Sequence, residues 1–158
     1  MSDPTDEERQ RQIAQHIAEM ADESVSHGLR GDMPSAVGTL APLFYEYGPD
    51  EAYAWVRAVL RKVVVPPCDC GMPHWPVIAQ WDADQQKAVP RDVHDPEVPL
   101  SVRLLAQMIA AQSNGDEDTE YALWNAAVTA EDAETVTAVM NRALLYAIRG
   151  AQARQDQQ

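Results

Sequence analysis

The chain has 158 residues, 46% of them hydrophobic, which suits one folded domain and excludes a disordered polypeptide. Its formal net charge of -13 argues against direct binding to nucleic acid, because the sequence has no basic stretch to neutralise a phosphate backbone. No apolar run reaches the length of a membrane span, and no secretory signal is visible at the N-terminus. The two cysteines lie one residue apart, so we expect a cytoplasmic protein and not a disulfide-linked secreted one.

The first third of the sequence predicts three helices. Thr5 is followed three residues later by a glutamate, which is the spacing of a capping box, so the first helix begins near Thr5 and ends in the glycine-containing stretch 27–32. A second helix is expected over about 34–47, and Pro42 should bend it or split it. A third helix begins at Pro49, because proline suits the first helical position.

Residues 65–99 form a different, proline-rich segment. Most of the eleven prolines of the chain lie here, and because proline removes a backbone donor and restricts φ, one long helix does not fit. Two local structures stay open: a short helix over about 76–87, or a small hairpin that pairs residues 63–65 with residues 77–78. The short helix is the favoured prediction.

Beyond the proline-rich segment, apolar residues recur at helical spacing and predict three further helices. The first of these ends at Gly115, and the next is capped by Asp116 or Asp118. The last carries a wide apolar stripe and is expected to end at Gly150, leaving residues 151–158 as a frayed tail.

These elements predict an all-α fold, an irregular bundle of five to seven helices. Short connections favour antiparallel neighbours, and no fixed repeat period recurs. We expect a single helical domain over residues 1–158, ordered from about 5 to 150. The segment 65–99 is then an irregular proline-rich insert in this domain.

Cys68, Cys70 and His74 form the best candidate for chemistry. Thiolate and imidazole are the preferred ligands of zinc, and a structural zinc site takes four ligands, so His94 is the expected fourth. Three acids could replace it: Asp69, Asp92 and Asp95. A bound zinc would explain how a long irregular connection holds one shape. The alternative, two ordinary thiols in a turn, is favoured because recognised zinc sites carry Cys-x-x-Cys pairs.

A second candidate is the stretch from Asp116 to Asn141, which has no Lys or Arg. It carries seven acids: Asp116, Glu117, Asp118, Glu120, Glu131, Asp132 and Glu134. Such a surface could dock on a basic protein or imitate nucleic-acid phosphates. The favoured alternative is that the acids mark two helix starts, since the helix dipole stabilises negative charge there.

No assembled set of nucleophile, base and acid is apparent in the sequence. We therefore expect a non-enzymatic interaction or regulatory protein that binds another protein, or its own copies as a homo-oligomer. Two alternatives stay open. One is an acidic nucleic-acid mimic that inhibits a basic DNA- or RNA-binding protein, and the other is a zinc-dependent enzyme centred on Cys68, Cys70 and His74.

Overall fold

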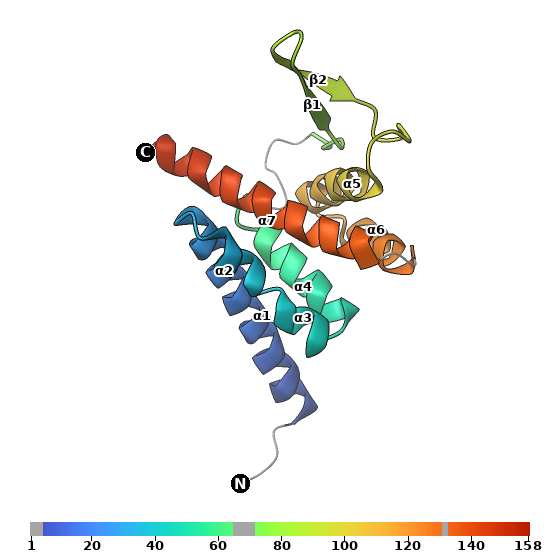
Figure 1. Cartoon of the computed structure of the whole chain (residues 1–158). Coiled ribbons are helices and arrows are strands. Elements are labelled where there is room, and N and C mark those ends of the chain that lie inside the picture. Colours follow the sequence, from blue (N-terminus) through green and yellow to red (C-terminus); the bar gives the residue numbers. More distant parts are fainter. Residues whose placement is uncertain (1–4, 65–71, 131–132) are drawn as a thin grey trace. The chain divides into compact units, whose positions relative to one another are not determined.

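The computed structural model describes three stretches of the chain: residues 5–64, 72–130 and 133–158. These residues contain seven helices and one two-stranded hairpin, so the fold is the predicted all-α irregular bundle (Figure 1). They fall in two compact units: Met1–Val63 with Ala143–Gln158, and Val64–Arg142. The expectation of one single domain stays a prediction.

The first unit holds the N-terminal helices and the second part of the last helix. Its elements are α1 (Asp6–Leu29), α2 (Met33–Gly38), α3 (Ala41–Tyr45), α4 (Pro49–Leu60) and, from Ala143, α7 (Ala133–Asp156). Thr5 caps α1 as predicted: its hydroxyl accepts from the amide of Glu8 at 3.3 Å, and the Glu8 carboxylate accepts from the amide of Thr5 at 2.9 Å. This reciprocal pair satisfies two amide groups that the first helical turn leaves without a partner.

The helix expected over 34–47 is two short helices, α2 and α3. Pro42 lies in the first turn of α3, where its missing N–H costs nothing, whereas a continuous helix would need that donor. Asp32 caps α2, because its carboxylate accepts from the amide of Ser35 at 3.2 Å. The predicted break at Pro42 is confirmed.

The core of the first unit is built from the apolar faces of its longer helices. Trp55, Val56 and Leu60 of α4 are fully buried, and α1 packs against α4 and α2. Ile17 of α1 and Leu144 of α7 are buried as well. The apolar stripes read from the sequence are therefore the faces that meet in this core.

Helix α7 continues through Gly150 to Asp156, which corrects the predicted helix end and the frayed tail after it. Gly150 lies inside the helix, and a Cβ there would overlap the side chain of Val63. A Cβ at Gly28, inside α1, would likewise overlap the side chain of Ile148. Both glycines allow close approach of a neighbouring side chain, so neither serves as a helix stop.

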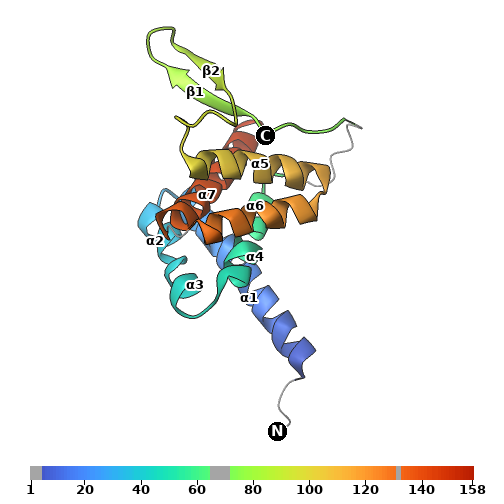
Figure 2. The same ribbon diagram turned by 90° about the vertical axis from the view of Figure 1, so that its right-hand side faces the viewer.

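The second unit carries the hairpin and the helices that follow it. Its elements are β1 (Ile78–Asp82), β2 (Lys87–Arg91), α5 (Leu100–Asn114), α6 (Glu117–Thr129) and the part of α7 up to Arg142. Gly115 ends α5 with a left-handed φ of 70°, as predicted. Asp116 caps α6 by accepting from the amide of Thr119 at 3.0 Å. Helices α5 and α6 lie side by side (Figure 2), and Met108 and Trp124 are fully buried.

Residues 78–91 form an antiparallel hairpin, so the predicted short helix over 76–87 is wrong. The alternative hairpin is also wrong in its partner strand, because Ile78 pairs with Arg91 and not with residues 63–65. The carboxylate of Asp82 accepts from the amides of the two loop residues Asp84 and Gln85, at 2.9 and 3.1 Å. An aspartate that satisfies loop amides in this way favours a turn over a helix.

Candidate functional site

Residues 72–77 run into β1 without helix or strand structure, and we call this segment the strap (Figure 2). Exposure alternates along it: His74 and Pro76 are half-buried, whereas Trp75 and Val77 are exposed. Alternation of this kind is typical of extended backbone, in which successive side chains point to opposite sides. The strap therefore has one side that faces the protein and one that faces solvent.

Asn114, the last residue of α5, holds the strap at His74. Its side-chain oxygen accepts from the backbone N–H of His74 at 2.7 Å, and its side-chain nitrogen donates to the backbone carbonyl of His74 at 2.9 Å. One amide side chain thus pairs with both backbone groups of a single residue, as a neighbouring β-strand would. The strap is fixed to the C-terminal end of α5 at this point.

A pocket of about 480 Å³ lies between the strap, the loop after the hairpin, α5 and the start of α6. Its walls are largely apolar and include Pro76, Val93, Ala110, Ala111 and Leu123. The polar lining groups are His74, His94, Gln107, Asn114, Asp116 and Thr119. This volume and this mixture of apolar walls with a few polar groups are usual for pockets that bind ligands.

The predicted zinc ligands are divided between described and undescribed parts of the chain. Cys68 and Cys70 lie outside the described residues, as does Asp69. His74 and His94 line the same pocket, although they are far apart in the sequence. Within the described ranges 5–64, 72–130 and 133–158, no group of three His, Cys, Asp or Glu side chains is placed to hold a metal ion. The zinc site stays a prediction.

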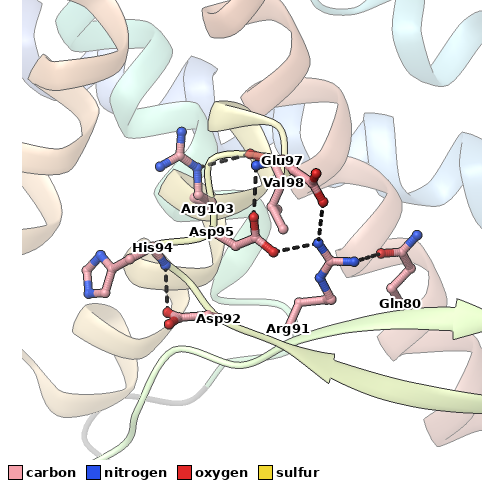
Figure 3. A network of polar contacts seen from close by, with 8 residues as sticks. All are labelled: Gln80, Arg91, Asp92, His94, Asp95, Glu97, Val98 and Arg103. Carbon is pink, nitrogen blue, oxygen red and sulfur yellow. Dashed lines mark hydrogen bonds and ion pairs between the residues drawn. The ribbon is translucent and has the colours of Figure 1, made fainter.

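Arg91 orders the loop that carries His94 (Figure 3). Its guanidinium binds the Asp95 carboxylate, lies 3.4 Å from Glu97 and donates to the side-chain oxygen of Gln80 at 2.9 Å. The other carboxylate oxygen of Asp95 accepts from the amide of Glu97 at 2.9 Å. This amide first, and then the Arg91 guanidinium, lower the pKa of Asp95 below its usual value. Asp95 is thus engaged within the loop, which makes it a poor substitute ligand for a metal.

Asp92 stabilises the same loop by a local hydrogen bond. Its carboxylate accepts from the backbone N–H of His94 at 2.8 Å, an arrangement typical of an Asx turn (Figure 3). Since Asp92 is exposed and acts on the backbone of His94, it helps to set where the imidazole of His94 leaves the chain. The loop and the strap together bring the two histidines to one pocket.

The predicted acidic surface is reduced by the structure. Three acids are exposed at the start of α6: Asp116, Glu117 and Asp118. Glu120 is fully buried, which corrects its assignment to the surface, because it lies on the same helix face as the buried Trp124 and Ala127. Glu134 is exposed on α7, and Glu131 and Asp132 lie outside the described residues.

Asp116 links the acidic start of α6 to the pocket. Asp116 lines the pocket, and its carboxylate accepts from the backbone N–H of Thr119. A hydrogen bond from the side chain of Thr119 first, and then the one from its backbone N–H, lower the pKa of Asp116 below its usual value. Asp116 is therefore ionised at neutral pH, and it places a negative charge at the pocket.

The exposed apolar side chains of the strap and the pocket beside it are not among the features predicted from the sequence. A signal for the strap was present, since an aromatic residue between prolines in a segment that cannot be a helix is a candidate for exposure. The pocket had no comparable signal, because its walls come from segments that meet only after folding.

No protein family, no curated protein and no solved structure matches the chain. Among the helices of the described residues, none is long and apolar enough to cross a membrane.

Proposed function

We propose that the chain is a non-enzymatic interaction protein that binds another protein at the strap. The observation that carries the proposal is the exposure of three large apolar side chains in six residues: Met72 at 72%, Trp75 at 77% and Val77 at 76%. Single exposed apolar residues are ordinary, but several in one short segment beside a pocket are typical of a binding surface. Trp and Met are also enriched at protein interfaces.

The attachment of the strap supports the same proposal. Asn114 fixes the backbone at His74, and Trp75 is the next residue along the chain. A side chain on a backbone that is already ordered loses less conformational entropy on binding, which leaves more of the contact energy as affinity. The strap is thus suited to present Trp75 as an anchor for a partner.

Photo-crosslinking tests this proposal. We expect p-benzoylphenylalanine in place of Trp75 to capture a specific protein from a lysate of the source cells, and the same group in place of Tyr146, an exposed residue of α7, to leave that protein uncaptured. With the captured protein purified, Trp75→Ala should weaken binding in calorimetry by at least about tenfold, since buried Trp anchors dominate interface energies. Tyr146→Ala is the matched control, and equal affinities for the two variants would contradict the proposal.

A structural zinc ion is a second proposal, supported by the position of His74 and His94 on one pocket. Together with Cys68 and Cys70 they would supply the four ligands that such a site requires. Elemental analysis of the purified chain should give about one zinc per chain, and His94→Ala should lower this content. Less than about a tenth of a zinc per chain would exclude the site, because a structural zinc is expected near full occupancy.

The acidic-mimic alternative receives less support from the structure. It needs an extended surface of carboxylates, and Glu120 is buried while the exposed acids of α6 are confined to its first turn. Acids in that position are explained by the helix dipole alone.

A further inference from the structure

We infer that the pocket beside α5 takes an apolar side chain from an extended peptide whose neighbouring residues are Lys or Arg. The inference rests on the proposed protein-binding function and specifies the chemistry of the partner segment. Three features support it: the apolar walls of the pocket, the charge at its opening and the position of Trp75.

The walls of the pocket suit an apolar group. Ala110 and Ala111 are small residues on a buried face of α5, and Leu123 of α6 is half-buried opposite them. Pro76 of the strap adds a further apolar surface. A leucine-sized or larger side chain that enters this space exchanges water for apolar contacts, which is the main favourable term in such binding.

The charge at the opening suits cations on either side of that group. Asp116 is ionised and lines the pocket, and the exposed Asp118 lies two residues after it. The described residues that line the pocket include no Lys or Arg, and neither does the sequence from Leu104 to Asn141. The ionised carboxylate of Asp116 at a pocket without Lys or Arg in its lining favours a basic peptide over an acidic one.

Trp75 adds a second preference for cations. Trp75 borders the pocket and is 77% exposed, so most of this residue is available to solvent or to a bound peptide. Lys and Arg side chains bind the face of a Trp ring through cation–π attraction. The indole and the Asp116 carboxylate thus favour the same residues beside an apolar anchor.

Titration of three blocked pentapeptides into the isotope-labelled full chain tests the inference by NMR. The first has leucine flanked by two lysines on each side, the second replaces leucine by serine, and the third replaces every lysine by glutamate. We expect the leucine–lysine peptide to shift the amide signals of Ala110, Ala111 and Leu123 and the indole signal of Trp75. The serine peptide should bind at least about tenfold more weakly, because burial of leucine is lost, and the glutamate peptide should leave the signals unchanged.

Two variants address the pocket and its charge separately. Thr119→Trp places a large ring in the pocket from an exposed position and should abolish peptide binding, while Asn125→Trp, on an exposed position of the same helix outside the pocket, should not. Asp116→Asn keeps an effective cap for α6 and removes the charge, so it should weaken binding roughly two- to fivefold, and the difference should vanish in high salt.

The outcomes separate the inference from the function on which it rests. The inference would be overturned if the serine peptide or the glutamate peptide bound as tightly as the leucine–lysine peptide. It would also be overturned if the signal shifts were confined to parts of the chain outside the pocket. If the protein captured at Trp75 binds Thr119→Trp as tightly as the unaltered chain, the pocket is not its site, although the protein-binding function stands. If Trp75→Ala also leaves that affinity unchanged, the proposed function itself is lost.

Discussion

Asn114 pairs with the backbone of His74, a residue forty positions away, through its side-chain amide alone. Each of the two hydrogen bonds contributes little by itself, because both groups could bind water instead. Together they fix the direction of the backbone at His74, just before Trp75. The Asn114 side chain therefore helps to determine how the strap presents Trp75.

Asn114→Ala should free the strap from α5. We expect a loss of about 1–2 kcal/mol in the free energy of unfolding, because two hydrogen bonds are removed. Hydrogen exchange at the amide of His74 should accelerate, because its acceptor is gone. Asn125→Ala, which removes an exposed amide from α6, is the control. Unchanged exchange at His74 in Asn114→Ala would contradict the proposed attachment of the strap by Asn114.

Asp95 makes the stability of its loop depend on pH. Its pKa is lowered by the amide of Glu97 and by Arg91, so its contribution is present above the ordinary aspartate value of 3.8 and is lost as the pH falls through the pKa of the folded state. Asp95→Asn should therefore be less stable than the unaltered chain at pH 7, and the difference should shrink below about pH 4.

Thermal melting between pH 7 and pH 2 measures this difference. Asp84→Asn in the hairpin loop removes the same charge and serves as the control. A difference between Asp95→Asn and the unaltered chain that stays constant across this range would exclude the Asp95 carboxylate as its source.

At the scale of the elements, two helix-interior glycines act through packing. Alanine normally favours a helix over glycine by about 1 kcal/mol, but a Cβ at Gly150 or Gly28 would overlap Val63 or Ile148. Gly150→Ala and Gly28→Ala should therefore destabilise the chain by about 1–3 kcal/mol, as overpacked sites do. Gly38→Ala, where no atom lies within 4 Å of the added Cβ, should stabilise it by about 0.5–1 kcal/mol.

Denaturant titration of the three variants decides the point. If Gly150→Ala raises the free energy of unfolding as Gly38→Ala is expected to do, helix propensity outweighs packing at Gly150, and the close approach of Val63 has little effect on stability.

The elements differ in how far the sequence alone predicted them. Thr5, Pro49 and Gly115 marked helix boundaries correctly, because caps and stops act over three or four neighbouring residues. The hairpin was missed because its pairing joins Ile78 to Arg91, and such a contact leaves no local periodicity. The end of α7 was placed too early, because Gly150 was interpreted as a stop when its role is contact with another element.

At the scale of the whole molecule, helix α7 contributes residues to both compact units. Trp55 lies in the first unit and Trp124 in the second, and both are fully buried. Because a continuous helix is shared, loss of either core should remove part of the other, and we expect calorimetry to record one unfolding transition. Trp55→Ala and Trp124→Ala should each lower it, at a cost of about 3–5 kcal/mol.

Two transitions, each sensitive to one of these substitutions, would instead indicate units that unfold independently. That result would also contradict the single domain expected from the sequence. Since a cost of 3–5 kcal/mol is a large part of the usual 5–15 kcal/mol of a folded protein, mild temperature or low denaturant should suffice to separate the cases.

The sequence by itself determined the all-α class, the starts of the main helices and the excess of acids, because caps, helical periodicity and net charge are properties of neighbouring residues or of composition. Only the tertiary structure decided that Glu120 is buried, that His74 meets Asn114, and that the strap borders a pocket. These features arise from contacts between segments far apart in the chain. Such contacts depend on which helix faces are used in packing, and no local pattern records that choice.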